Sequence, residues 1–310
     1  MTNAFSPLLY QLSHQPLSQK MPQRKSVACL PTPQQELLLR AALLDGQEAV
    51  EAFRVWQGQV DLDKLDDGSS RLLPLLYKNL KKNRVQDSCM GKLKAIYRQT
   101  FLDNQVLLYK SLPALRALKA AGIELMLLKG AALCVSHYED SGMRPMCDID
   151  ILVPTAKSRE ATAVLSTLGC TPLFKAVHAQ SFRTPDGVEL DLHWHALLEF
   201  SQENSDDYFW AKARAATIYN LAVLIPDSTD ALFHVCIHGL KWNEIPPIRW
   251  IADAQVILRA ESTIDWHRLL RLAKRHRLML RLKESLQYLK RLLHAPIPEE
   301  ILAELEADSI

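Results

Sequence analysis

Two aspartates, Asp148 and Asp150, stand one residue apart in the apolar segment 146–153. The segment is typical of a buried β-strand, in which side chains alternate between two faces. Both aspartates therefore lie on one face, while Ile149 and Ile151 lie on the other. Two neighbouring carboxylates at the edge of an apolar core repel each other and lose hydration. A divalent cation would offset both costs, so the pair indicates metal-assisted chemistry.

A second acidic strand follows, and it favours this interpretation over a solvated strand end. Glu189, Asp191 and His193 alternate with leucines and so share one strand face. A Pro-Asp-Gly turn signal separates residues 181–184 from 188–194, which predicts an antiparallel hairpin. Asp191 lies in the middle of its strand, whereas Glu189 lies beside the turn. Asp191 is therefore the better candidate for a third carboxylate at the same site.

A phosphate-binding turn is predicted at Lys129-Gly130. These residues close the short apolar run 123–128 and precede a predicted helix at 131–138. A strand-to-helix turn presents backbone N–H groups and the positive end of a helix dipole, and both favour phosphate. Lys129 adds a mobile positive charge beside them.

These three features together resemble the polymerase-β-like nucleotidyltransferases. The details are most similar to a largely uncharacterised bacterial nucleotidyltransferase family that has Lys-Gly in place of the usual Gly-Ser. The resemblance spans roughly residues 33 to 275 and rests on Leu128-Lys129-Gly130, Tyr138, Arg144-Pro145, residues 148–153, Leu190-Asp191-Leu192-His193-Trp194, Leu73-Pro74-Leu75-Leu76-Tyr77, the stretch from His234 to His238, Arg249-Trp250 with Asp253, and Asp265-Trp266.

The resemblance implies a reaction as well as a fold. In that superfamily three carboxylates hold two Mg²⁺ ions, which bind a nucleoside triphosphate (NTP) and activate an incoming hydroxyl. It implies that Asp148, Asp150 and Asp191 are catalytic residues and ligands of Mg²⁺ or Mn²⁺. The expected activity moves a nucleoside monophosphate to an acceptor hydroxyl and releases pyrophosphate. The resemblance implies no particular acceptor, so a small molecule, a protein or peptide, and an RNA all stay open.

Four residues are candidates for nucleotide binding, namely Lys129, Gly130, Arg144 and His193. Lys129 either reaches the β- or γ-phosphate, or marks a site in which nucleotide binding is altered or lost. Arg144 either clamps phosphate or pins its loop to a carboxylate. His193 either orients Asp191 or contacts phosphate, or else makes an ordinary hydrogen bond.

Two rival functions use the same fold. One is a non-catalytic or antitoxin-like regulatory binding protein, against which the intact carboxylates argue. The other is a phosphotransferase that acts on the γ-phosphate. It would need a different pose of the nucleotide, which Lys129 does not exclude. We expect the enzyme that transfers a nucleotide.

Three helical features have simpler interpretations. His234 and His238 have the four-residue spacing of a zinc pair, but no acidic general base lies between them, so a packed pair is favoured. Arg249 and Asp253 have the spacing of an ion pair within one helix, with a position in the lining of the active site as the alternative. Leucines interleave with the basic residues of 268–291, which favours a solvated helix face over a nucleic-acid surface.

The composition is that of an ordinary globular protein. The 310 residues are 48% hydrophobic and 23% charged, and the formal net charge of +2 indicates no polyanionic partner. The six cysteines form no Cys-x-x-Cys pair, which favours reduced thiols in a cytoplasmic protein. No apolar run approaches the roughly 18–20 residues of a membrane span, and no signal-peptide block is seen.

The elements that must position the site predict an α+β fold. We expect a small mixed or antiparallel nucleotidyltransferase sheet flanked by N-terminal and C-terminal helical regions. The expected division is a poorly ordered leader at 1–31, a helical region at 32–120, the αβ core at 121–204 and a helical domain at 205–310.

Within these regions the patterns predict a long helix at about 88–121, with an interruption near Pro113, and one extra strand at 217–223. Further helices are expected at 155–168, 229–241, 248–259, 265–276, 278–293 and 299–306.

Overall fold

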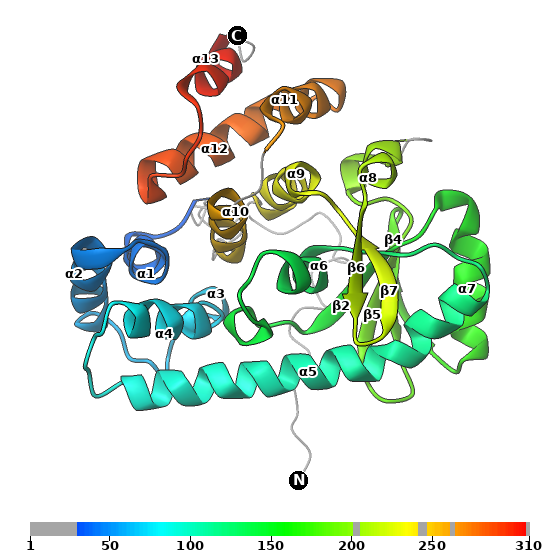
Figure 1. Ribbon diagram of the computed structural model, residues 1–310, viewed down its shortest axis with the longest axis horizontal. Coiled ribbons are helices and arrows are strands. Elements are labelled where there is room, and N and C mark those ends of the chain that lie inside the picture. The colour runs from blue at the N-terminus through cyan, green and yellow to red at the C-terminus, as the bar shows by residue number, and fades with distance from the viewer. Residues whose placement is uncertain (1–29, 201–204, 241–246, 261–263, 308–310) are drawn as a thin grey trace, which may run out of the picture.

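The computed structural model describes residues 30–200, 205–240, 247–260 and 264–307 (Figure 1). Of the predicted leader, residues 1–29 lie outside the described residues. No helix of the described ranges is long and apolar enough to cross a membrane.

A seven-stranded mixed sheet carries the two acidic segments. Its order is β3-β4-β5-β2-β1-β7-β6, and the inner pairs β2–β5 and β1–β7 are parallel while all other pairs are antiparallel. This confirms the predicted mixed sheet with flanking helices. The strands are β1 (Met126–Leu127), β2 (Asp148–Leu152), β3 (Thr171–Lys175), β4 (Ala179–Arg183), β5 (Glu189–His193), β6 (Arg214–Ile218) and β7 (Leu221–Ile225).

Three strands differ from the prediction, while the hairpin of β4 and β5 is as predicted. The single strand expected at 217–223 is wrong, because β6 and β7 form a further hairpin that turns at Tyr219, whose φ is +45°. This hairpin extends the sheet beyond residue 204, where the core was expected to end. The edge strand β3 was not predicted. All five of its residues are exposed, so no buried face marks it in the sequence.

The helices extend well beyond the sheet (Figure 1). They are α1 (Pro33–Leu43), α2 (Gly46–Gln57), α3 (Asp67–Ser70), α4 (Leu73–Lys82), α5 (Met90–Ala120), α6 (Lys129–Ser136), α7 (Ser158–Thr167), α8 (Asp207–Ala211), α9 (Ser228–Gly239), α10 (Arg249–Arg259), α11 (Trp266–Arg275), α12 (Met279–Leu293) and α13 (Glu299–Ala307). Helices α5 and α6 contact the sheet directly. The expected interruption of α5 near Pro113 is absent, and the helix continues through it.

Two hydrophobic cores organise these elements. One lies between the sheet and α5, α6 and α7, and it receives Ile149 and Ile151 from β2 and the leucines of β5. The other combines the helices from both ends of the chain, from α1 to α4 and from α9 to α13. The two helical regions that the sequence separates therefore pack together, as Figure 1 shows for α1 and α10. The acidic face of β2 is turned away from the first core.

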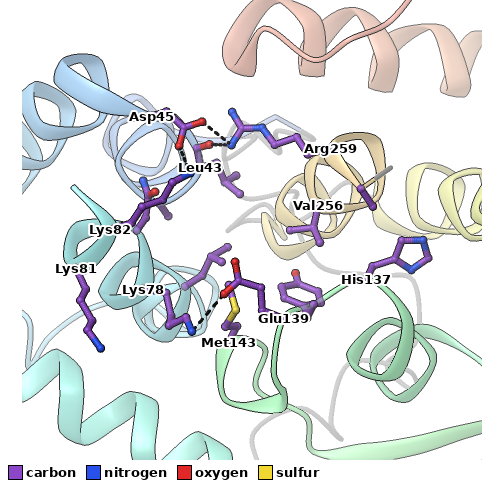
Figure 2. Close-up of a pocket in the computed structure, with 15 residues that line it drawn as sticks. Leu43, Asp45, Lys78, Lys81, Lys82, His137, Glu139, Met143, Val256 and Arg259 are labelled. Atoms are coloured by element: carbon purple, nitrogen blue, oxygen red, sulfur yellow. Dashed lines mark hydrogen bonds and ion pairs between the residues drawn. The ribbon is translucent and has the colours of Figure 1, made fainter. Parts of the chain in front are cut away.

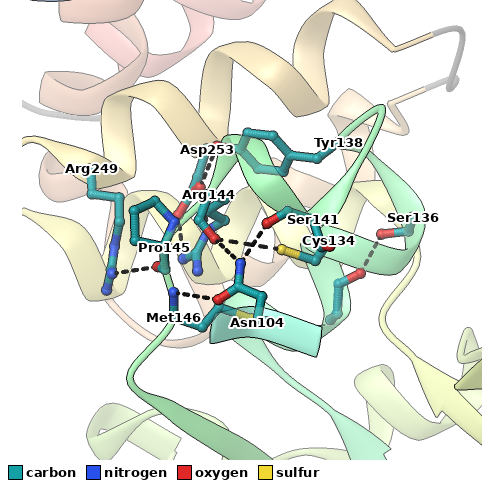
Figure 3. A network of polar contacts seen from close by, with 11 residues as sticks. Asn104, Cys134, Ser136, Tyr138, Ser141, Arg144, Pro145, Met146, Arg249 and Asp253 are labelled. Carbon is teal, nitrogen blue, oxygen red and sulfur yellow. Dashed lines mark hydrogen bonds and ion pairs between the residues drawn. The ribbon is translucent and has the colours of Figure 1, made fainter. Parts of the chain in front are cut away.

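The long helix α5 fixes the segment that leads into β2. The side chain of Asn104 donates from Nδ2 to the carbonyl of Arg144 at 2.8 Å, and its Oδ1 accepts from the N–H of Met146 at 3.1 Å (Figure 3). Asn104 is fully buried. Because these bonds hold the backbone just before Asp148, α5 sets where the acidic strand begins.

Candidate active site

The register of two parallel strands brings the acidic residues together. Asp150 of β2 lies opposite Asp191 of β5, and Leu152 lies opposite His193. Neighbouring strands are about 4.8 Å apart, so side chains on one face at these positions meet. The donor atoms of Asp150, Asp191 and His193 all lie within 4.8 Å of one another. We refer to Asp148, Asp150 and Asp191 as the carboxylate cluster.

Asp150 is the buried centre of this cluster, and two cationic or polar partners hold it. Its Oδ1 lies 2.6 Å from Lys129 Nζ and 3.0 Å from His193 Nε2. Burial alone would raise the pKa of Asp150, but Lys129 and His193 outweigh it and hold the pKa well below its usual range. Asp150 is therefore ionised. One alternative from the sequence was that His193 orients Asp191, but in the structure His193 contacts Asp150.

The other two carboxylates have no such partners. Within the described ranges, neither Asp148 nor Asp191 forms a hydrogen bond or ion pair through its carboxylate. Burial raises the pKa of Asp148, and the charges of Asp150 and Asp191 raise it further. The ligand atoms that converge are those of Asp150, Asp191 and His193, while Asp148 lies outside this group and is coupled to both aspartates only through its charge. Two carboxylates with too little countercharge fit Mg²⁺ or Mn²⁺, and the imidazole of His193 would suit Mn²⁺ better than Mg²⁺.

This imbalance gives a stability prediction for the metal-free protein. The Asp148→Asn variant should melt a few degrees higher than the wild type, because the substitution removes a half-buried charge that its neighbours repel. The Asp150→Asn variant should melt lower, because Lys129 and His193 lose the negative charge that they contact. Thermal unfolding followed by circular dichroism in the presence of a chelator measures both changes. A lower melting temperature for Asp148→Asn would contradict the assigned repulsion.

Lys129 sits in an unusual backbone conformation at the turn between β1 and α6. Its φ is +45°, in the left-handed region that a residue with a Cβ adopts at a cost of about 1–3 kcal/mol. The turn is held because the N–H of Leu128 donates to the carbonyl of Asp150 at 3.0 Å and Lys129 Nζ contacts the Asp150 carboxylate. The predicted phosphate-binding lysine thus contacts the carboxylate cluster itself.

Gly130 has a steric role in the structure. A Cβ on Gly130 would lie 2.3 Å from Nη1 of Arg144 and 3.1 Å from Cγ of Met146. The guanidinium cannot easily yield, because Arg144 is buried and its Nε and Nη2 donate to Asp253 at 2.7 and 2.8 Å (Figure 3). Tyr138 donates to the same carboxylate at 2.7 Å.

Arg144 therefore binds a buried carboxylate of the protein. Of its two sequence-based alternatives, this is the one in which Arg144 pins its loop to a carboxylate. The predicted ion pair between Arg249 and Asp253 is wrong, because Asp253 pairs with Arg144 across the fold. The Arg249 side chain instead donates to the carbonyl of Pro145 at 3.4 Å. Spacing along one helix does not reveal a competing partner from a distant loop.

The two histidines of α9 form a packed pair. His234 Nε2 lies 2.9 Å from the carbonyl of Ala196, and its ring centroid is 5.7 Å from that of His238. Burial, together with the positive charge of Lys129, lowers the pKa of His234 to about 3. A histidine that sequence reasoning missed lies beside the cluster: the ring of His178 is 5.6 Å from that of His193.

The profile of a family described as an uncharacterised nucleotidyltransferase matches residues 69–294. The chain belongs to this family. The match includes the whole carboxylate cluster, the Lys129-Gly130 turn and helices α9 and α10. A search of curated proteins finds no match to this chain.

Three solved structures are similar to parts of the chain. The crystal structure of ANT(2'')-Ia in complex with adenylyl-2''-tobramycin is 14% identical, covers 55% of this chain and 96% of its own, and gives a TM-score of 0.39. The solution structure of the antibiotic-resistance factor ANT(2'')-Ia is 15% identical, covers 61% of this chain and 98% of its own, and gives a TM-score of 0.40. The crystal structure of an antigenic nucleotidyltransferase-like protein from Paracoccidioides brasiliensis is 16% identical, covers 63% of this chain and 94% of its own, and gives a TM-score of 0.38.

Proposed function

We propose that this protein is a Mg²⁺-dependent nucleotidyltransferase that moves a nucleoside monophosphate from an NTP to an acceptor hydroxyl. A bond forms between the acceptor oxygen and the α-phosphorus, the bond from the α-phosphorus to the bridging oxygen breaks, and pyrophosphate leaves. The observation that carries the proposal is the carboxylate cluster, in which Asp148 and Asp191 have no partner among the described residues. Membership of the family supports nucleotidyl transfer.

The residues of the cluster would have separate roles. Asp148, Asp150 and Asp191 would hold Mg²⁺ or Mn²⁺, which when bound would offset phosphate charge and lower the pKa of the acceptor hydroxyl. Asp191 has a carboxylate free to accept the hydroxyl proton. His193 holds the orientation of Asp150 through the 3.0 Å contact.

Lys129 and the start of α6 would bind the phosphates. The first N–H groups of a helix lack intrahelical acceptors, so α6 offers donors beside Lys129. Lys129 Nζ would leave Asp150 and turn to a phosphate, since its side chain is 22% exposed while that of Asp150 is 5% exposed. The same amine would thus serve as countercharge to Asp150 before the nucleotide binds.

A labelling experiment tests the proposed reaction. The protein is incubated with Mg²⁺ or Mn²⁺ and each α-labelled NTP, together with RNA, a cell lysate or no addition. Label should pass to an acceptor with the wild type and not with Asp148→Ala/Asp150→Ala. The proposal fails if no label is transferred and calorimetry detects no metal-dependent NTP binding.

One observation favours a second candidate, a non-catalytic or antitoxin-like regulatory protein. Lys129 already compensates Asp150, so the cluster could persist without metal. This candidate predicts that a chelator leaves partner binding unchanged. The enzyme proposal predicts that the chelator abolishes label transfer.

The proposal leaves the acceptor class open among small molecules, proteins or peptides, and RNA. We place the reaction in the cytoplasm, which is supported by five described cysteines that are all free thiols.

A further inference from the structure

A small cavity adjoins the carboxylate cluster on the side of α9 and α10. Its volume is about 200 Å³, below the roughly 300–1,000 Å³ of pockets for drug-sized ligands. It therefore suits a fragment of a ligand, such as a few phosphate groups. Its lining comprises Lys129, Arg144, His234, Val235, His238, Gly239, Pro247, Arg249, Trp250 and Asp253. Lys129 both lines the cavity and contacts Asp150, so the cavity lies next to the cluster.

The wall of this cavity contains an arginine with unused donors. Arg249 has no carboxylate within ion-pair distance in the described part of the chain, and its one hydrogen bond, to Pro145, is long at 3.4 Å. Burial lowers the pKa of Arg249, and the neighbouring Arg144 lowers it further. Arg144 differs, because Asp253 takes two of its donors. An anion in the cavity would supply the partner that Arg249 lacks.

A second donor in the same wall also lacks an acceptor. Trp250 is 5% exposed, and its indole Nε1 is buried without a hydrogen-bond partner among the described residues. Gly239 of α9 makes room for this ring, since a Cβ there would lie 2.1 Å from Cβ of Trp250. Because Nε1 is buried within the wall and does not face the cavity, Trp250 shapes the cavity but gives no separate support for an anion in it.

A larger cavity elsewhere in the molecule differs in how its cations are paired. It has a volume of about 640 Å³ and lies between α4, α10 and the loop after α6 (Figure 2). Lys78 pairs there with Asp140 and Glu139, and Lys82 pairs with Asp45. Its cations are thus largely satisfied within the protein, and no residue of the carboxylate cluster lines it.

We propose that the cavity between α9 and α10 binds the terminal phosphates of the NTP, with Arg249 as their main side-chain donor. This inference rests on the proposed function and makes it more specific. It assigns phosphate binding to Arg249 instead of Arg144, whose guanidinium is held by Asp253. Lys129, which borders both the cavity and Asp150, then lies between the terminal phosphates and the carboxylate cluster.

Calorimetry with inorganic tripolyphosphate tests this assignment on the full-length protein. The wild type should bind the probe in the presence of a chelator, and Arg249→Gln should bind it at least about ten-fold more weakly. Arg249→Lys should recover part of the affinity. Arg116→Gln is the matched control, because Arg116 lines another cavity, far along α5, and also lacks a carboxylate partner within the described ranges. Equal affinity of Arg249→Gln and wild type, or no binding by the wild type, would overturn the proposal.

A measurement on the unmutated protein covers the case in which Arg249→Gln does not fold. Phenylglyoxal modifies accessible arginines, and mass spectrometry locates them. Tripolyphosphate should protect Arg249 but leave Arg116 reactive, and unchanged modification of Arg249 would refute the assignment. The two proposals can fail separately. If tripolyphosphate binding depends on Arg249 but no label is transferred from an NTP, only the proposed enzymatic reaction is refuted. If label is transferred but Arg249→Gln binds tripolyphosphate as tightly as the wild type, only the proposed phosphate site in the cavity is refuted.

Discussion

Replacement of Asp253 by asparagine should lower the free energy of unfolding by about 3–5 kcal/mol. Asp253 accepts three hydrogen bonds, two from Arg144 and one from Tyr138, and all three side chains are buried. The substitution leaves the Arg144 cation without its countercharge, next to Arg249. Urea unfolding measures the change. A loss below about 1 kcal/mol would contradict this account of the buried pair.

Two comparisons make the measurement specific. Asp63→Asn removes an exposed partner of Lys92 and should cost less than about 1 kcal/mol. The double variant Arg144→Met/Asp253→Leu should be more stable than Asp253→Asn, because neither side chain is then a buried charge without a partner. A double variant less stable than Asp253→Asn would show that packing, rather than charge, dominates here.

The same pair predicts a dependence of stability on pH. Burial would raise the pKa of Asp253, but Arg144 outweighs it, so the pKa lies below its usual range in the folded state. Because the pKa of Asp253 is lowered by folding, the ionised carboxylate stabilises the folded state at every pH above its pKa in the unfolded chain, about 3.9. This stabilisation is lost as the pH falls through the pKa of Asp253 in the folded state. The stability of the wild type should therefore fall more steeply than that of Asp253→Asn below about pH 4.

The Asp191→Asn variant should lose transfer activity about a thousand-fold or more and yet keep its stability. A metal ligand at the reacting phosphate supplies several kcal/mol of transition-state stabilisation, which corresponds to about three powers of ten in rate. The carboxylate of Asp191 has no partner among the described residues, so its loss should not lower the free energy of unfolding, and the relieved repulsion with Asp148 should raise it slightly. Initial rates of label transfer and urea unfolding measure the two effects.

Glu189→Gln is the matched control for this variant. Glu189 shares the strand face of Asp191, but its carboxylate lies 2.6 Å from Nη2 of Arg183 at the exposed end of the hairpin. The control should keep near-wild-type activity. Equal losses in both variants would contradict the choice of Asp191 as the third carboxylate, and full activity of Asp191→Asn would exclude it.

Strand periodicity was enough to predict the acidic face of the sheet. The alternation around Asp148, Asp150 and Asp191 depends only on neighbouring residues, and in the structure their apolar neighbours fill the sheet core. The parallel register that places Asp150 opposite Asp191 could not be read from the sequence, because it depends on how strands distant in the chain pair.

Long-range partners account for most of what the sequence did not reveal. The contact of Lys129 with Asp150 and the competition between Arg144 and Arg249 for Asp253 arise between separate elements. The shared core of the N-terminal and C-terminal helices is a further case, since each helix shows only its own apolar face. The division into domains stays a prediction, although β6 and β7 join the sheet from beyond residue 204.

The most direct test of the central claim is calorimetric binding of an NTP analogue that cannot be cleaved between its α- and β-phosphates. The claim is that the carboxylate cluster holds an NTP through a divalent cation. The wild type should bind the analogue with Mn²⁺ or Mg²⁺ much more tightly than with a chelator, and Asp191→Asn should lose this dependence on metal. Equal affinity with and without metal in the wild type would contradict the claim.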